Sequence, residues 1–402
     1  MVEWKYINEI IVSLKTGLNP RQNFRLNTPE SIFPYITGKD IFNNKINVTS
    51  VTDRVDSKAV DLINKRAYLE DNLLLFASTG TGTVGRMAII EKYESDWAIS
   101  ETLYAIKTTD AISPQFLMYS LYSDIAKKQY EPKISKGSVP HLKIVDLLKV
   151  KIPIPSLEEQ TRIVGILDTF TSAIDNLKEQ IAQRKKQYEY YRDQLLDLEG
   201  KPGVEMKSLS NCCSLITKQT GFDYSKTIKP SLTTAKLDDS IPFIQNKDFE
   251  GTRINLNTDF YIPFSIAQQF PKIMLNEKIL LVSISGKIGN VGLYELNNVS
   301  FVGGAICVCR LRKENNGRYI LYYLLSHKGQ STLFRSVKAA SHSNITVESI
   351  RETLIPLPSL QEQQRIVSIL DTFETSIQNL EAQLALREKQ YEYYRNKLLT
   401  FD

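Results

Sequence analysis

Two long stretches of the chain carry apolar residues at alternating steps of four and three. The first series begins at Ile163 and ends at Leu198, and the second begins at Ile366 and ends at Phe401. Such steps place side chains along one side of an α-helix, in the heptad pattern of helices that pair through a seam. The main seam positions are Ile163, Leu167, Phe170, Ile174, Leu177, Ile181, Tyr188, Tyr191, Ile366, Leu370, Phe373, Ile377, Leu380, Leu384, Tyr391 and Tyr394.

Each seam lies in a segment that is predicted to form a single long helix. A Pro-x-Pro sequence fixes an extended segment first, and Ser156 or Ser359 follows it with a glutamate three residues later, which is a capping-box pattern. No proline follows within either segment. We therefore expect a helix from about residue 157 to 198, on the order of 60 Å long at 1.5 Å per residue, and a second one like it near the C-terminus.

A helix of this length with one apolar side needs a partner to cover that side. The two seams can pair with each other, pack on their own domains or form a homodimer. Pairing within the chain is favoured, because one chain carries both seams at high effective concentration. Arg184 and Arg387 take the seventh place of each seam, and we interpret them as register markers or as side chains that reach the solvent.

The two helical segments are copies of one sequence. Residues 152–199 and 355–402 are identical at 30 of 48 positions, at a constant offset of 203. The preceding segments correspond more weakly. The unit is far longer than a solenoid repeat of about 20 to 50 residues. The sequence therefore predicts a first body (1–151), a first tail (152–200), a second body (201–354) and a second tail (355–402).

Each body reads as a mixed α/β or α+β domain. Short strand patterns such as residues 73–76 and 279–282 alternate with turn signals, and helical patterns cover residues 114–129 and 319–337. The bodies differ most where strands and loops would present side chains. Two similar scaffolds with different surfaces fit two different ligands.

A glycine-rich loop follows a strand pattern in each body. Residues 80–85 spell GxGxxG, but a dinucleotide-binding loop needs a helix directly after it. Here residues 86–90 read as another strand, and the counterpart at residues 286–292 breaks the spacing. We interpret the loop as a glycine-rich hairpin and expect no cofactor there.

Small residues in such loops allow a partner to approach the backbone, and hydroxyl, amide and cationic side chains donate to phosphates and base edges. A second polar loop, residues 136–141 and 339–344, precedes each tail, and its histidines fit capping or surface roles better than catalysis. An ordinary solvated turn is the alternative at each position. The candidate DNA-contacting residues are Thr37, Lys39, Ser78, Thr79, Thr81, Thr83, Arg86, Lys136, Ser138, His141, Gln245, Asn246, Lys247, Ser285, Lys287, Asn290, Lys338, Ser341, His342 and Asn344.

Composition narrows the setting of the chain. The net charge of +5 permits a DNA partner without requiring one. Four cysteines match neither a disulfide framework nor paired zinc-ligand spacing, which favours a reducing cytoplasm. The N-terminus lacks signal-peptide features, and no apolar run approaches the roughly 20 residues that span a bilayer. Secretion and membrane insertion are therefore not expected.

Catalytic motifs are missing from the sequence. It contains no HExxH, no Walker A lysine motif, no GxSxG and no histidine, cysteine and carboxylate cluster at metal-ligand spacing. Its one Asn-Pro, at Asn19-Pro20, is followed by Arg21, so the Asn/Asp-Pro-Pro-aromatic segment of amino-methyltransferases is absent too. We expect the chain to be no enzyme by itself, and to hold neither a metal nor a cofactor.

The duplicated tails resemble those of the specificity subunits of type I restriction-modification enzymes. The matching runs are Ile-Pro-x-Pro-Ser-Leu-x-Glu-Gln at 152 and 355, Arg-Ile-Val-x-Ile-Leu-Asp-Thr-Phe at 162 and 365, and Lys-Gln-Tyr-Glu-Tyr-Tyr-Arg at 186 and 389. The last run is similar to that of the C subgroup. The resemblance covers essentially the whole chain.

The resemblance implies a pseudo-two-fold molecule with two target-recognition domains, residues 1–151 and 201–354. Their spacer helices would pair as an antiparallel coiled coil that acts as a ruler. Each domain would read one half of a bipartite site in double-stranded DNA. Two modification subunits that methylate adenine N6 with S-adenosylmethionine would dock on the helices, and restriction subunits would add ATP- and Mg-dependent translocation and cleavage. The alternative is a coiled-coil scaffold or adaptor whose bodies bind proteins.

Overall fold

The computed structural model describes residues 2–295, 298–335 and 344–401. It divides into two compact units, one made of Met1–Gln180 with Leu380–Asp402 and the other of Ile181–Asn379. Each unit combines one body with a part of each tail. Within the described residues, no helix has both the length and the apolar character needed to cross a bilayer.

The first body mixes short strands and helices, as the sequence predicts. Its elements are β1 (Glu3–Tyr6), α1 (Ile7–Ile10), β2 (Ile11–Thr16), α2 (Pro20–Asn23), β3 (Phe33–Ile36), η1 (Gly38–Asp40), β4 (Ile41–Phe42), β5 (Lys45–Ile46), β6 (Arg54–Val55), α3 (Ser57–Ala67), β7 (Leu74–Ala77), β8 (Met87–Ile89), β9 (Ala98–Ile99), β10 (Leu103–Thr108), α4 (Pro114–Tyr122), α5 (Asp124–Tyr130), η2 (Glu131–Lys133), α6 (Ile144–Leu147) and β11 (Lys151–Ile154).

A four-stranded antiparallel sheet, in the order β2-β10-β7-β8, forms the centre of this body. Successive side chains of a strand point to opposite faces. Leu74 and Phe76 accordingly join one apolar cluster with α4, α5 and the start of the first tail, while Leu75 and Ala77 join another with α3 and β9. Burial on both faces explains why β7 is apolar at every position.

The second body consists of a similar series of elements. They are β12 (Glu205–Ser208), α8 (Leu209–Cys212), β13 (Cys213–Lys218), α9 (Gly221–Asp223), η3 (Tyr224–Ile228), η4 (Lys229–Ser231), β14 (Ser240–Ile244), η5 (Asn246–Asp248), β15 (Phe249–Glu250), β16 (Arg253–Ile254), β17 (Tyr261–Pro263), α10 (Phe264–Ala267), β18 (Met274–Leu275), β19 (Ile279–Ser283), β20 (Val291–Tyr294), β21 (Ser300–Val302), β22 (Ile306–Leu311), α11 (Gly317–Leu325), α12 (His327–Phe334), α13 (Val347–Glu352) and β23 (Leu354–Leu357).

The central sheet of the second body repeats the strand order of the first. The order is β13-β22-β19-β20, again antiparallel, so each strand has a counterpart in the other body. Cys307 and Cys309 point from β22 into one apolar cluster, and Ile306 and Val308 point into the other. All four cysteines are buried and free.

The helices predicted at residues 114–129 and 319–337 are each divided in two; the last two residues of the second range lie outside the described part of the chain. The break falls at Ser123 in the first body and at Ser326 in the second, where the backbone is extended. Each serine hydroxyl accepts a hydrogen bond from a backbone N–H of the next helix, that of Ala126 or Gly329. An internal N-cap therefore starts a new helix within an otherwise helical pattern.

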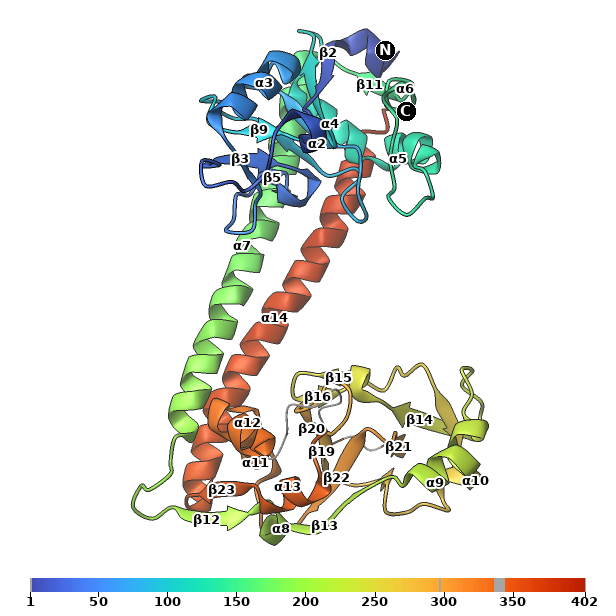
Figure 1. The fold of residues 1–402 in the computed structure, drawn as a ribbon. Helices are drawn as coiled ribbons and strands as arrows, with labels where there is room; N and C mark the ends of the chain where they lie inside the picture. Colours follow the sequence, from blue (N-terminus) through green and yellow to red (C-terminus); the bar gives the residue numbers. More distant parts are fainter. Residues whose placement is uncertain (1, 296–297, 336–343, 402) are drawn as a thin grey trace. The chain divides into compact units, whose positions relative to one another are not determined.

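Each tail forms one unbroken helix, α7 (Leu157–Leu196) and α14 (Leu360–Leu398), as predicted (Figure 1). The Pro-x-Pro segments before them are the strands β11 and β23, which pair with β1 and β12. The hydroxyl of Ser156 accepts from the Glu159 N–H at 3.3 Å, and Ser359 accepts from Glu362 at the same distance.

The seam residues pack in both units. In the first unit Ile163 and Leu167 are fully buried, and in the second Ile366 and Leu370 are. Aromatic seam residues of the two helices also stack: Phe170 lies on Tyr394 in the first unit, and Phe373 lies on Tyr191 in the second, with ring centroids 5.5 Å apart in each pair. Ile174, Ile181 and Ile377 are nearly buried, and Leu177, Tyr188, Leu380, Leu384 and Tyr391 are partly exposed.

Both seam arginines lie over aromatic rings. The guanidinium of Arg387 is 5.8 Å from the ring centre of Phe170, and that of Arg184 is 5.9 Å from Phe373. A cation over an aromatic face is attracted by the ring quadrupole. The polar place in each seam is thus matched to a phenylalanine on the other helix of the same unit.

Candidate nucleic-acid interface

Three polar loops that are distant in sequence come together in the first body. The backbone N–H of Gly80 donates to the carbonyl of Pro140 at 2.9 Å, and Thr79 Oγ1 lies 2.7 Å from Nδ1 of His141. A Cβ placed on Gly38 would lie only 3.1 Å from the Cβ of Thr83. The loops at residues 37–40, 78–86 and 135–141 therefore form one polar surface region.

Several candidate side chains of this region are engaged in holding the loops. The buried hydroxyl of Ser78 donates to the carbonyl of Thr102, and Thr83 Oγ1 donates to the carbonyl of Thr79. Thr37 Oγ1 donates to Asp40, and Arg86 donates to the carbonyl of Ile41. The side chains exposed to the solvent are Lys39, Thr81, Lys136 and Ser138.

The second body brings its corresponding loops together in the same way. Asn246 Nδ2 donates to the carbonyl of Ser285, and the Ile345 N–H donates to the carbonyl of Ile284 at 3.0 Å. Lys247 forms an ion pair with Asp259. Gln245, Ser285 and Asn290 are partly exposed and Lys287 and Asn344 are exposed, while Lys338, Ser341 and His342 lie outside the described residues.

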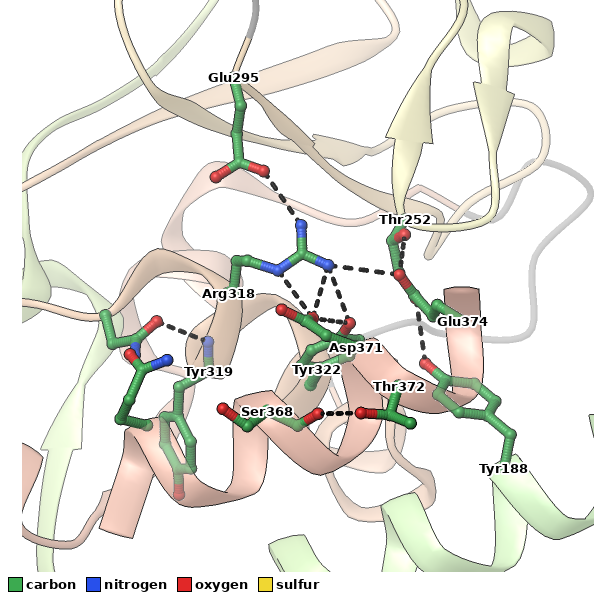
Figure 2. A network of polar contacts seen from close by, with 12 residues as sticks. Tyr188, Thr252, Glu295, Arg318, Tyr319, Tyr322, Ser368, Asp371, Thr372 and Glu374 are labelled. Atoms are coloured by element: carbon green, nitrogen blue, oxygen red, sulfur yellow. Dashed lines mark hydrogen bonds and ion pairs between the residues drawn. The ribbon is translucent and has the colours of Figure 1, made fainter. Parts of the chain in front are cut away.

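A charged network joins the second body to α14. Figure 2 shows the guanidinium of Arg318, at the start of α11, between the carboxylates of Glu295, Asp371 and Glu374. Arg318 lies 2.7 Å from Asp371, 3.0 Å from Glu295 and 3.3 Å from Glu374. The hydroxyl of Tyr322 donates to Asp371 at 2.6 Å.

Glu374 is the point at which three elements meet. It accepts a hydrogen bond from Thr252, in the turn between β15 and β16, and one from Tyr188 on α7. Its side chain is only 12% exposed, and burial raises the pKa of its carboxyl group. Arg318 supplies the positive charge that a buried carboxylate requires. The network therefore fixes the β15–β16 hairpin against the helices.

The first body keeps only one part of this arrangement. The hydroxyl of Tyr119 donates to Asp168 at 2.5 Å, as Tyr322 does to Asp371. At the offset of 203, however, Gln115 stands where Arg318 is, and Thr171 stands where Glu374 is. A cavity of about 370 Å³ lies there, lined among others by Thr171 and by Asn44 of the β4–β5 turn.

Sequence reasoning missed this network for an identifiable reason. The shared Tyr-Asp pair does recur at the offset of 203, and its aspartates belong to the Leu-Asp-Thr-Phe run of both tails. A seam prediction considers apolar positions only, so these two aspartates were not among the candidate residues. Arg318 and Glu374 occur in one half only, so the repeat gives no signal for them.

The chain matches a known protein family. The model for the type I restriction modification DNA specificity domain matches residues 1–186 and residues 222–386. The specificity subunit of the type I restriction enzyme EcoR124I/EcoR124II from Escherichia coli is 34% identical over 265 residues. That match covers 62% of this chain and 63% of the relative's length.

Two further comparisons extend over more of the chain. The specificity subunit of the type I restriction enzyme MjaIX from Methanocaldococcus jannaschii is 25% identical over 379 residues, which cover 89% of this chain and 83% of the relative. The crystal structure of the S subunit of a type I restriction-modification system from M. genitalium matches with a TM-score of 0.58 at 15% identity. It covers 99% of this chain and 96% of that one, so the two share a fold.

Proposed function

Because this chain belongs to the family of type I restriction-modification DNA specificity proteins, we propose that each of its bodies reads one half of a bipartite DNA target. The observation that carries the proposal is the double match of the specificity domain, with one match beginning in each body. The polar loop regions of the two bodies support it, since they have the same position in the fold and different side chains.

The loop regions carry the two kinds of contact that sequence-specific binding needs. Contacts to phosphates position a protein on the duplex, and contacts to base edges specify the sequence. Exposed lysines such as Lys39, Lys136 and Lys287 suit phosphates. Because these contacts release counterions, binding is expected to weaken as salt is raised.

The tails are proposed to pair as an antiparallel coiled coil that sets the gap between the half-sites. Contacts within each unit support this order. In the first unit Phe170, near the start of α7, stacks on Tyr394, near the end of α14, and in the second unit Tyr191 of α7 stacks on Phe373 of α14.

The catalytic steps are proposed to belong to partner subunits. Two modification subunits would dock on the helices and methylate adenine N6 with S-adenosylmethionine, and restriction subunits would use ATP and Mg for translocation and cleavage, all in the cytoplasm with the DNA. The absence of catalytic motifs from the sequence supports this division. Tyr190 and Tyr393, at equivalent positions on α7 and α14 and each 59% exposed, offer docking surface.

Methylome sequencing tests the proposal directly. Cells that express this chain with its genomic modification partner should show a bipartite N6-methyladenine motif that disappears when the chain is deleted. A deletion strain with the modification subunit alone is the control. If the partner is active and no motif depends on this chain, the function as a DNA reader is wrong and a scaffold function takes its place.

Lengthening both helices tests their function as a ruler. Seven residues added to the middle of α7 and of α14 preserve the heptad seam and lengthen each helix by about 10 Å. The gap of the methylated motif should grow by about three base pairs at 3.4 Å per pair, with both half-sites unchanged. An unchanged gap in a protein that still methylates DNA contradicts the ruler.

A further inference from the structure

A cavity of about 590 Å³ opens in the loop region of the second body. Its walls come from the end of β14, the loop after β19 and the loop between β21 and β22. Tyr224 and Phe243 supply aromatic surface, Gln245 and Asn246 supply carboxamides, and Lys247 supplies a cation.

Two glycines line the cavity at positions where the first body has larger residues. The Gly303 N–H donates to the carbonyl of Ile244 at 2.8 Å, as the Ser100 N–H does to Ile36 at 2.9 Å, which aligns Gly303-Gly304 with Ser100-Glu101. In the first body Glu101 occupies this place and accepts from Asn19 at 2.8 Å and from the hydroxyl of Tyr35 at 3.2 Å. Gly304 has no side chain, and the amide of Gln219 lies beside it instead.

One unpaired amide group lines this cavity, and another lies next to its wall at Gly304. Gln219 is 4% exposed, and neither its amide nitrogen nor its amide oxygen has a hydrogen-bond partner among the described residues. Its Oε1 is 3.2 Å from the place where Gly304 would carry a Cβ. Asn246 lines the cavity and donates to Ser285, but its buried Oδ1 is unpaired as well. Buried polar groups without partners are costly, so this site is built for a polar ligand.

The first body has none of this chemistry at the same positions. Asn246 corresponds to Gly38, and Gln219, directly after β13, corresponds to Gly17, directly after β2. A Cβ at Gly17 would lie 1.7 Å from the carbonyl oxygen of Ile99, so no side chain fits there. The pair of carboxamides is therefore a property of the second body.

We propose that this cavity is the base-reading site of the second body and that it takes the edge of an adenine. Asparagine and glutamine carboxamides recognise adenine, since they accept from N6 and donate to N7. Asn246 Oδ1 and the amide of Gln219 supply the free acceptor and donor. The partly exposed Tyr224 supplies an aromatic surface for a base. Lys247 at the rim, which pairs with Asp259 here, suits a phosphate. The assignment rests on the proposed DNA-reading function.

Two substitutions in the complex with the modification subunits test the assignment. Gly304→Glu places the acid of the first body in the cavity and should slow methylation of target DNA by about ten- to a hundredfold. Gln219→Glu keeps the shape but removes the free amide donor, and a glutamate accepts from N4 of cytosine. It should shift one position of the second body's half-site from adenine toward cytosine and leave the other half-site unchanged. Ser265→Glu adds a carboxylate at the exposed position of α10 in the same body and should leave rate and motif unaltered.

The outcomes separate the two levels of the proposal. If the unmodified complex methylates a bipartite motif but Gln219→Glu leaves every position of that motif unchanged, the adenine site is wrong, whatever Gly304→Glu does. A rate for Gly304→Glu equal to that of Ser265→Glu overturns it too. If the unmodified complex shows no motif that depends on this chain, the DNA-reading function itself fails.

Discussion

Replacing Arg318 with alanine is expected to destabilise the second unit by about 3 kcal/mol, because breaking a largely buried ion pair leaves its partner charges uncompensated. The Arg318 side chain is 24% exposed, and its partner Glu374 is 12% exposed. Without the guanidinium, Glu374 and Asp371 would face each other with no positive charge between them. The deficit should be larger at pH 8 than at pH 5, since burial already raises the pKa of Glu374 and protonation removes its charge.

Hydrogen exchange during urea titration is the suitable measurement, because it reports on each unit separately. Peptides from residues 201–335 should lose protection at lower urea in Arg318→Ala. Both tryptophans, Trp4 and Trp97, lie in the first unit, so the fluorescence transition should stay in place. The matched control is Gln115→Ala at the equivalent position of the first body, with a change within about 0.5 kcal/mol. Equal losses from both substitutions would show that the network contributes little.

The two bodies differ in how they contact the tail helices, and Glu374 with its equivalent Thr171 accounts for the difference. In the second body Thr252 of the β15–β16 turn is tied to Glu374 of α14. In the first body the equivalent turn, with Asn44, borders a cavity beside Thr171. Duplication kept the Tyr-Asp pair that attaches each body to a tail. The ion pair of Arg318 with Glu374 has no counterpart at Gln115 and Thr171, the equivalent positions of the first half.

The parts of the fold that depend on periodic burial could be predicted from the sequence. The steps of four and three identified both long helices, and a continuous apolar run identified β7 and β19, whose side chains are buried on both faces of a sheet. The break at Ser123 was missed because a serine cap inside a helical pattern does not alter the apolar spacing. The sequence pattern predicts secondary structure well where burial alternates regularly from one residue to the next along a helix or strand.

The candidate site was less accessible to sequence reasoning. Strand ends and glycines mark turns, so the loops that contain Thr79 and His141 could be located from the sequence. In the structure these two side chains are in hydrogen-bond contact. The sequence did not show which side chains are free to bind a partner. Ser78 donates to a backbone carbonyl, whereas the amide of Gln219 has no hydrogen-bond partner among the described residues. The exchange of Glu101 for Gly304 becomes meaningful only after strand pairing aligns the two bodies. Such facts depend on contacts between segments far apart in the chain.

The second large effect is expected at the seam. Leu370→Ala should destabilise the second unit by about 3 kcal/mol, because removing a fully buried leucine forfeits its transfer free energy and leaves a cavity. Leu370 packs in one cluster with Leu196 of α7 and Tyr322 of α11. Leu167→Ala should do the same in the first unit, where Leu167 packs with Leu399 of the second tail and Tyr119. Hydrogen exchange under urea measures both.

The control is Leu386→Ala on α14, where the leucine is 58% exposed and the change should stay within about 0.5 kcal/mol. Because each unit contains parts of both helices, each seam substitution should weaken its own body together with both helical parts packed on it. If Leu370→Ala lowered protection only in α14 and left α7 residues 181–196 unaffected, the helices would be stabilised by their bodies alone. Joint loss of protection in the two helical parts would instead mean that the seam couples them within the second unit, as the proposed spacer requires.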